Sequence, residues 1–596
     1  MIAGDELRRR AQALGVETSY VDVDGRDHRT PEPTLRHVVD VLLDDRAGAP
    51  TGRQLEPVIV VGGPAAAPPD VPVGDARAAE LVLADGTTVG LAVHGRHATV
   101  PQDVPYGCHR LRTTGPAGDD DATVVVAPAA MPRDPDLAGR AGLFVPAYAL
   151  WERSSPLPSY GHLADLAARL PALGLDLLAT LPLYAAFLDV PFDPSPYSPL
   201  SRLHWNEAYL DDASLPPAEV PAMGATIDWR ALGRRRRAQL LRAADDLAPA
   251  TRQAIDAYAL EQPDVVEYAR FRAARPDPID AEHPVELVRR SHLLAQHLAS
   301  EQLRAVERPG RARLALDLPI GSHPAGFETW AYGELFASAM TVGAPPDLLF
   351  AGGQNWGFPP QLPWAGRRNG HLLWRQLVAR AGAHASVLRI DHVMGVHRLW
   401  WIPAGSGPED GTYVRYPREE LLAVIAAEAA ATATTVVGED LGTVPPEIRA
   451  ALATWDALGL YEEQFHLAVD GLTGDGLAPI PARSVAGVRT HDMPAFAAAV
   501  AGQDLASYRN RLAKTVGHPL AADEAGLFDA VLERLAASDA YLVVADLDDL
   551  TGEVEPHNTP GRIGPTTWRR RSRAPISDMM CGDVRRRARL LSARTR

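Results

Sequence analysis

The sequence contains few cysteines, a single lysine and no long apolar run. Cys108 and Cys581 are the only cysteines in 596 residues, too few and too far apart for a zinc motif or a disulfide framework. No stretch reaches the length of a membrane-spanning helix, and the N-terminus begins with charged residues instead of the apolar core of a signal peptide. We therefore expect a soluble protein of the reducing cytoplasm, with no membrane partner.

The net charge of the chain further limits the classes of binding partner that we expect. Lys+Arg 59 against Asp+Glu 75 gives a formal net charge of −16, which argues against binding to nucleic acid or to an anionic membrane. The pair Gly62-Gly63 lacks the spacing of a dinucleotide fingerprint, and there is no phosphate-binding Gly loop of the Walker type. The sequence therefore implies no cofactor and no nucleic-acid partner.

The composition changes along the chain in a way that predicts three regions. Residues 1–55 show two amphipathic helical patterns separated by a turn at Gly25-Arg26-Asp27. In residues 56–135, short apolar runs alternate with Gly, Pro and Asp turns, which predicts a β-sandwich-like domain. From residue 136 to 596 the pattern alternates between strand and helix, with a charged, helix-patterned insertion at about 205–307.

The third region contains eight candidate strands, the number that closes a (β/α)₈ barrel. They are short apolar runs at residues 143–148, 177–183, 313–319, 386–390, 434–437, 461–467, 485–488 and 541–545. We therefore expect an α/β fold, a (β/α)₈ TIM barrel with helical insertions, preceded by the small helical segment and the β-sandwich-like domain.

Three acidic residues follow candidate strands and mark a candidate active site. Asp391, Glu439 and Asp492 each come just after a strand, where a parallel barrel collects its catalytic groups. A reaction that cleaves a glycosidic bond with retention of the anomeric configuration needs one carboxylate as nucleophile and a second carboxyl group as acid and base. Arg389 lies two residues before Asp391 and so on the same face of the strand, where its charge would keep that carboxylate ionised.

Other interpretations of the same residues stay open at this point. An isolated Asp after a strand is more often a helix cap or a turn residue, and Asp440 suits that role. His392 and His397 are residue types that bind metals, but no further ligand is spaced to complete a site. We therefore expect no metal.

Several ordered motifs resemble the 4-α-glucanotransferases, also called amylomaltases or disproportionating enzymes, which form family 77 within the α-amylase clan. The resemblance runs from about residue 143 to residue 572 and favours the bacterial long-chain branch. The matching motifs are Ser195-Pro196-Tyr197-Ser198-Pro199, Gly353-Gln354-Asn355-Trp356-Gly357, Arg389-Ile390-Asp391-His392, Gly438-Glu439-Asp440-Leu441-Gly442, Thr490-His491-Asp492-Met493-Pro494 and His557-Asn558-Thr559-Pro560-Gly561. The segment at residues 151–162 follows the family pattern only loosely.

The resemblance implies a role for each residue of a complete catalytic set. Asp391 would be the nucleophile, Glu439 the acid/base, and Asp492 the residue that grips the sugar hydroxyls. The other implied substrate-binding residues are Arg389, His491, Tyr197, Asp317 and Asn558 around the same subsite, and Asp347, Gln354 and Trp356 in a loop that folds over the glucan. Such a loop would exclude water and favour transfer over hydrolysis.

The implied function is transfer of an α-1,4-glucan segment from a maltooligosaccharide to the 4-hydroxyl of glucose or of another α-1,4-glucan. A hydrolase of the same clan is the main alternative. A glucan-binding protein on a degenerate barrel is a second alternative, but it should lack one of the three carboxylates, and all three are present. The sequence leaves open the oligomeric state, with a homodimer as one option, and the choice between maltose and glycogen metabolism.

Overall fold

The fold was analysed in a computed structural model that describes residues 4–22, 25–47, 53–116, 118–221, 223–346, 352–442, 444–467 and 476–594. The chain separates into two compact units. The first unit comprises Met1–Arg133, Ile320–Ala383 and Ile390–Ala457, and the second comprises Asp134–Pro319, His384–Arg389 and Leu458–Arg596. Within the described residues, no helix is both long and apolar enough to span a membrane.

An eight-stranded sheet forms the centre of the (β/α)₈ barrel, and all eight predicted strands are confirmed. Their order in the sheet is β22-β19-β16-β11-β10-β25-β24-β23, and every pairing with a described register is parallel. The strands are β10 (Arg140–Phe144), β11 (Leu177–Ala179), β16 (Arg313–Leu318), β19 (Val387–Ile390), β22 (Thr435–Gly438), β23 (Gly459–Glu462), β24 (Ser484–Gly487) and β25 (Leu542–Asp546).

The predicted bounds of three strands are wrong, and each error has a local cause. Strand β10 ends before Pro146, which has no N–H to give to a ladder and which precedes a 3₁₀ turn at Ala147–Ala149. Strand β11 ends at Ala179, and at the next residue the hydroxyl of Thr180 accepts a hydrogen bond from the backbone N–H of Ala147. Strand β23 ends at Glu462, because the following Glu463 turns inward to Arg534 and Tyr508.

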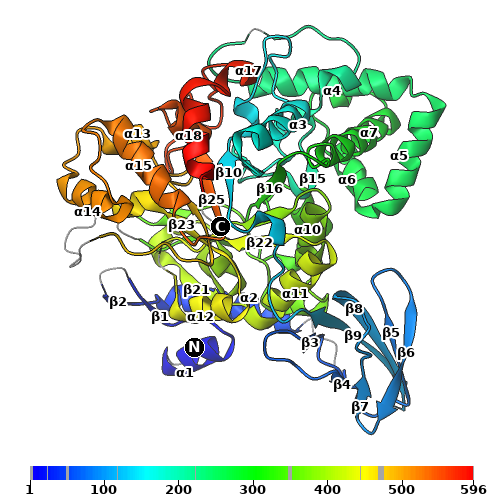
Figure 1. Ribbon diagram of the computed structural model, residues 1–596. Coiled ribbons are helices and arrows are strands. Elements are labelled where there is room, and N and C mark those ends of the chain that lie inside the picture. The colour runs from blue at the N-terminus through cyan, green and yellow to red at the C-terminus, as the bar shows by residue number, and fades with distance from the viewer. Residues whose placement is uncertain are drawn as a thin grey trace. The chain divides into compact units, whose positions relative to one another are not determined.

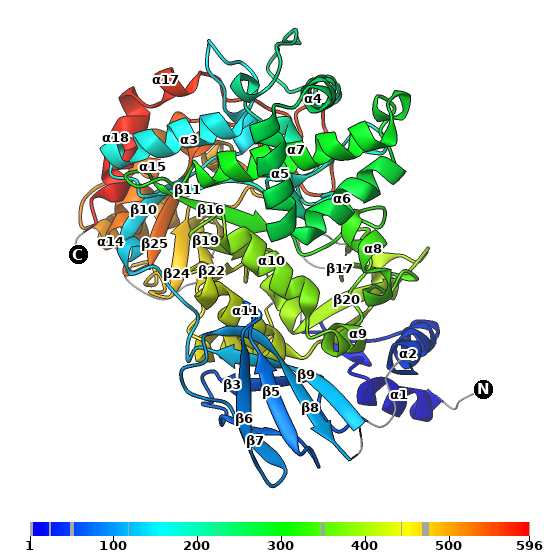
Figure 2. The ribbon, with the colours of Figure 1, turned by 90° about the vertical axis from the view of Figure 1, so that its right-hand side faces the viewer.

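The second unit contains a group of helices between β11 and β16, within the predicted insertion. These helices are α4 (Trp229–Asp245), α5 (Pro249–Glu261), α6 (Pro263–Ala274) and α7 (Val285–Arg304), and they lie beside one another in Figures 1 and 2. A buried ion pair between Arg237 and Asp280 holds part of their interior, with 2.7 Å between Nη2 and Oδ1. Part of the arginine run at residues 234–237 is therefore buried and not a solvated helix face.

The first unit also contains a separate mixed sheet with its own core, in which one strand pairing is parallel and the others are antiparallel. Its strand order is β3-β9-β8-β5-β6-β7-β4, and the strands are labelled in Figure 1. The strands are β3 (Val58–Gly62), β4 (Asp70–Pro72), β5 (Ala78–Val82), β6 (Thr88–His94), β7 (His97–Thr99), β8 (Gly107–Gly115) and β9 (Gly118–Ala127). Leu81, Leu111 and Val124 are fully buried between them. The expected domain limits at residues 55 and 135 stay a prediction.

The N-terminal segment packs on a four-stranded sheet of the same unit. Helices α1 (Gly4–Ala13) and α2 (Glu32–Ala47) flank a hairpin of β1 (Ser19–Val21) and β2 (Asp27–Arg29), where only a turn was expected. The sheet has the order β18-β17-β20-β21, from β17 (Met340–Ala344), β18 (Gln354–Asn355), β20 (Arg398–Pro403) and β21 (Thr412–Arg415). Leu35 of α2 and Trp401 of β20 belong to one hydrophobic cluster, and Glu17 pairs with Arg398 and Arg415.

This shared core predicts a large stability cost for a small change in α2. Leu35 is completely buried, so Leu35→Ala should lower the free energy of unfolding of the first unit by roughly 2–5 kcal/mol. Urea unfolding followed by tryptophan fluorescence measures the change. The matched control is Val21→Ala in β1, where the side chain is 61% exposed and a change below about 0.5 kcal/mol is expected. Equal stability of both variants would contradict a shared core.

Candidate active site

The barrel places each of the three predicted carboxylates beyond the C-terminal end of a strand. Asp391 follows β19 directly, and Glu439 follows β22 directly. Asp492 lies in the segment that connects β24 to α13 (Phe496–Val500). Asp391 and Glu439 belong to the first unit, and Asp492 belongs to the second.

In the first unit, backbone amides fix the side chain of Glu439. The N–H of His392 donates to Oε2 at 2.9 Å, and the N–H of Leu441 donates to Oε1 at 2.8 Å. The backbones also meet, because Glu439 N–H donates to the carbonyl of Ile390 and Val393 N–H donates to the carbonyl of Glu439. Ile390 and His392, the residues on either side of Asp391, are therefore hydrogen-bonded to Glu439, the residue predicted to act as the acid/base.

His392 and Trp356 form an aromatic contact next to Asp391. The rings meet edge to face, with 5.1 Å between their centroids, and Trp356 Nε1–H donates to Gln354 Oε1 at 3.2 Å. Burial lowers the pKa of His392 to about 4, an effect that Asp391 opposes and Arg398 strengthens. His392 is therefore neutral at neutral pH. Asp347, the third residue predicted in this loop, lies outside the described residues.

In the second unit, Tyr197 and Arg389 meet at Asp317. The Tyr197 hydroxyl donates to Asp317 Oδ2, and Arg389 Nη1–H donates to Asp317 Oδ1, both at 2.6 Å. Asp317 is buried at the end of β16, where an uncompensated carboxylate would be costly, so these two donors stabilise its charged form. The sequence pattern did not predict this partner for Arg389.

His491, Asp492 and Asn558 form the other part of this group. The His491 ring stacks on Tyr197 at 4.9 Å between centroids, and burial lowers the pKa of His491. Asn558 Nδ2–H donates to Asp492 Oδ1 at 2.6 Å, and His491 Nε2 lies 3.4 Å from Asp492 Oδ2. The Asp492 side chain stays 49% exposed, so it is held in place and still open to a ligand.

Two aromatic residues and one acidic cluster in this unit were not among the predicted site residues. Trp568 and Phe144 lie against the His491 ring, at centroid distances of 6.0 and 6.4 Å. Arg489 contacts an acidic run that follows β25, the same pattern that identified the three carboxylates. Among the residues that the structure describes, no three His, Cys, Asp or Glu side chains group in a way that could hold a metal ion.

Comparison with known proteins identifies the family. The sequence profile of the 4-alpha-glucanotransferases matches residues 279–576. The 4-alpha-glucanotransferase of Mycobacterium tuberculosis (strain H37Rv) is 32% identical, over 89% of this chain and 84% of its own length. The chain belongs to the 4-alpha-glucanotransferase family. The 4-alpha-glucanotransferase of Haemophilus influenzae is 26% identical, over 83% of this chain and 80% of its own length.

Solved structures share the fold over nearly the whole chain. Amylomaltase from Corynebacterium glutamicum matches with a TM-score of 0.83 and 22% identity, covering 99% of this chain and 100% of its own. Amylomaltase from Streptococcus agalactiae in complex with acarbose matches with a TM-score of 0.66 and 17% identity, covering 77% and 100%. The predicted 4-alpha-glucanotransferase activity is confirmed at the level of the family, and the transferase is favoured over the hydrolase alternative.

The pKa of His392 gives a test of the first-unit contacts. Its imidazole should be mostly neutral down to about pH 5, so its Cε1–H signal should shift little between pH 8 and 5 in NMR of histidine-labelled protein. The signal is assigned by its loss in His392→Gln. Exposed His518 is the control, since a hydrogen bond to the Pro519 carbonyl and another to Glu533 raise its pKa above the usual 6.5. A His392 midpoint near that of His518 would contradict the buried position.

Proposed function

We propose that this 4-alpha-glucanotransferase transfers a segment of an α-1,4-glucan from a maltooligosaccharide donor to the 4-hydroxyl of glucose or of another glucan. The observation that carries the proposal is a complete set of three carboxylates, each just beyond a barrel strand, in a chain of this family. In a parallel barrel the C-terminal strand ends carry the catalytic groups. The cytoplasm as its compartment and a homodimer as its assembly remain predictions.

Asp391 and Glu439 have the residue types and strand positions needed for double displacement. Asp391 attacks the anomeric carbon and forms a covalent glucosyl ester, while Glu439 protonates the departing oxygen. Glu439 then takes the proton of the acceptor hydroxyl, which attacks the same carbon and releases Asp391. Two inversions at one carbon retain the configuration. The neighbouring places of β19 and β22 in the sheet support this pairing.

The second-unit residues suit the binding of the sugar that reacts. Asp492 presents a half-exposed carboxylate for two sugar hydroxyls, and Asn558 and His491 hold it. Arg389, Asp317 and Tyr197 form a polar chain in the same unit. Hydrogen bonds to sugar hydroxyls that strengthen as the oxocarbenium-like transition state forms lower its free energy more than that of the bound substrate.

Trp356, Gln354 and Asp347 are proposed to cover the reacting sugar. Trp356 lies against His392, the residue after the proposed nucleophile, and is tied to Gln354. A cover at this position lowers the access of water to the glucosyl ester and leaves the sugar acceptor as the attacking group. This is the physical reason for transfer instead of hydrolysis.

Incubation of the purified enzyme with maltotriose tests the proposal. The expected products are glucose and a ladder of longer glucans, with a nearly constant number of reducing ends. Asp391→Asn and Glu439→Gln should each lower kcat by roughly 10³-fold or more with unchanged folding. Asp440→Asn is the matched control for a carboxylate after the same strand. Rising reducing ends without longer products, or near-normal activity of either variant, would contradict the proposal.

Replacement of Trp356 separates transfer from hydrolysis. Trp356→Ala should raise the ratio of reducing ends formed to glucan transferred by roughly 10-fold, because water gains access to the covalent intermediate. Trp356→Phe keeps an aromatic ring beside His392 and should change the ratio far less. The ratio is measured with maltotriose by counting reducing ends and chain lengths in the same sample. An unchanged ratio in the alanine variant would exclude Trp356 as a cover.

A further inference from the structure

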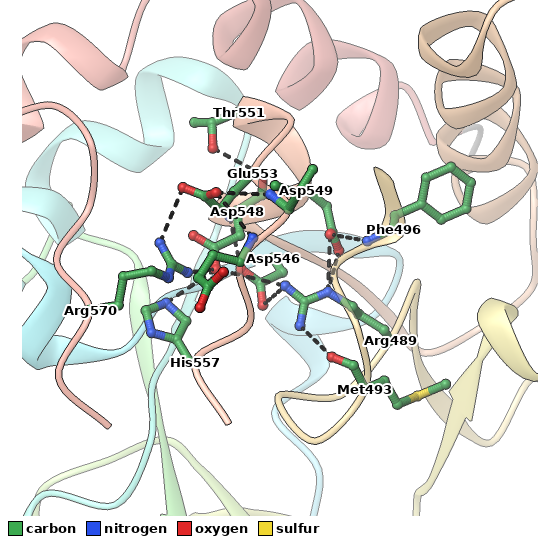
Figure 3. Close-up of polar contacts among 12 residues, drawn as sticks. Arg489, Met493, Phe496, Asp546, Asp548, Asp549, Thr551, Glu553, His557 and Arg570 are labelled. Atoms are coloured by element: carbon green, nitrogen blue, oxygen red, sulfur yellow. Dashed lines mark hydrogen bonds and ion pairs between the residues drawn. The ribbon is translucent and has the colours of Figure 1, made fainter. Parts of the chain in front are cut away.

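The segment between β24 and α13 carries His491 and Asp492 and is fixed by a buried ionic cluster. This cluster consists of Arg489 at the start of the segment and an acidic run at the end of β25 and in the first turn of α16 (Leu547–Thr551). The acidic residues are Asp546, Asp548 and Asp549, and all three are buried. Figure 3 shows them grouped around the guanidinium of Arg489.

Asp549 is attached to both ends of the segment. Arg489 Nε–H is 3.0 Å from each oxygen of Asp549, and the backbone N–H of Phe496 donates to Asp549 Oδ1 at 2.8 Å (Figure 3). The side chain of Asp549 has no exposed surface. A single buried carboxylate therefore sets the separation between residue 489 and residue 496.

Arg489 also reaches the backbone inside the segment. Its Nη1–H donates to the carbonyl of Thr490 at 3.2 Å and to the carbonyl of Met493 at 3.4 Å, on either side of His491 and Asp492. Its Nη2 lies 2.9 Å from Asp546 Oδ2, so a second carboxyl group forms an ion pair with the guanidinium. The backbone on both sides of Asp492 is thus hydrogen-bonded to the buried guanidinium of Arg489.

A second series of contacts connects the same acidic residues to the side chain of Asp492. Asp548 pairs with His557 Nε2 at 3.2 Å, and the Nδ1 atom of His557 is 3.1 Å from the Tyr148 hydroxyl. The next residue, Asn558, donates to Asp492 Oδ1. Asp492 is therefore held through its backbone by Arg489 and Asp549, and through its side chain by Asn558.

We propose that Asp549 and Arg489 are positioning residues that hold Asp492 in the geometry needed for transfer, an inference that rests on the proposed role of Asp492. Both side chains are buried, so neither is placed to contact a substrate. Removal of one partner of this cluster should strongly lower the stability of the fold, because it leaves a buried charge without compensation. Burial also raises the pKa of Asp546 to about 8, against the effect of Arg489, so the cluster holds fewer negative charges at neutral pH than its carboxyl groups suggest.

A double-mutant cycle between Asp549 and Asp492 tests the proposal. Asp549→Asn keeps an oxygen acceptor for the Phe496 N–H but removes the charge that Arg489 contacts. In the wild-type background it should lower kcat for maltotriose disproportionation by roughly 10- to 100-fold, since small displacements of a positioned group cost rate steeply. In the Asp492→Asn background the same change should cost less than about threefold, because the group being positioned has already lost its function.

A matched buried ion pair of the same unit serves as the control. Asp280→Asn removes the charge that pairs with Arg237 in the helical insertion and keeps an oxygen acceptor, at a site that is buried to a similar degree. It should lower the thermal midpoint without changing kcat in either background. Arg489→Lys keeps the charge and loses the donors to Thr490 and Met493, so it provides a second variant if Asp549→Asn does not fold. It should show the same dependence on Asp492.

Each outcome separates the positioning role from the role of Asp492 itself. Normal activity of Asp492→Asn would overturn the proposed role of Asp492, whatever the other variants do. An impaired Asp492→Asn with normal activity of Asp549→Asn and Arg489→Lys would overturn the positioning role alone. Equal losses of kcat from Asp549→Asn in both backgrounds would assign the cluster to stability only and would also overturn it.

Discussion

The strands of the parallel barrel are short and buried, and this constrains where polar side chains can lie. A parallel sheet covered on both faces excludes uncompensated polar groups from the strand interiors, so they collect at the strand ends. Strand β22 is completely buried along Thr435–Gly438, and Glu439 follows it at once. Strand β16 ends with buried Asp317 and Leu318, and hydrogen bonds from Arg389 and Tyr197 offset the cost of burying the Asp317 carboxylate. The residues of the candidate active site lie where this packing rule allows polar side chains.

Burial and exposure are combined differently in the residues that hold the site and in the residues that act. Arg489, Asp546 and Asp549 are buried, and their contacts are ionic and specific in direction. Asp492, by contrast, keeps half of its side chain exposed. A carboxylate that is proposed to exchange bound water for sugar hydroxyls needs access to solvent. The buried residues that hold it in place need hydrogen bonds and ion pairs that do not change when the sugar binds. The strength of buried charge-assisted hydrogen bonds makes this division possible.

The sequence predicted the strands and the acidic residues because both depend on local pattern. Eight apolar, β-branched runs gave eight strands, and each acidic residue was located by its place after one of them. The strand ends were less predictable, because they depend on contacts such as Glu463 with Arg534, which are 71 residues apart. The partners of the site residues escaped prediction for the same reason. Arg389 precedes Asp391 closely in sequence, yet its described carboxylate partner, Asp317, lies 72 residues away.

The acidic run after β25 shows what a local pattern can and cannot reveal. Asp546, Asp548 and Asp549 follow a strand end, as Asp391 does, so their position alone would have suggested catalysis. What distinguishes them is that they are buried and are paired with Arg489, Arg570 and His557. Carboxyl groups that are buried in this way are not placed to contact a sugar. Asp549 instead contacts Arg489 and the Phe496 N–H, and Arg489 in turn contacts the carbonyls of residues 490 and 493 in the segment that carries Asp492. In this fold, a carboxylate at a strand end is therefore a candidate catalyst only where it keeps access to solvent, and otherwise supports a neighbouring one.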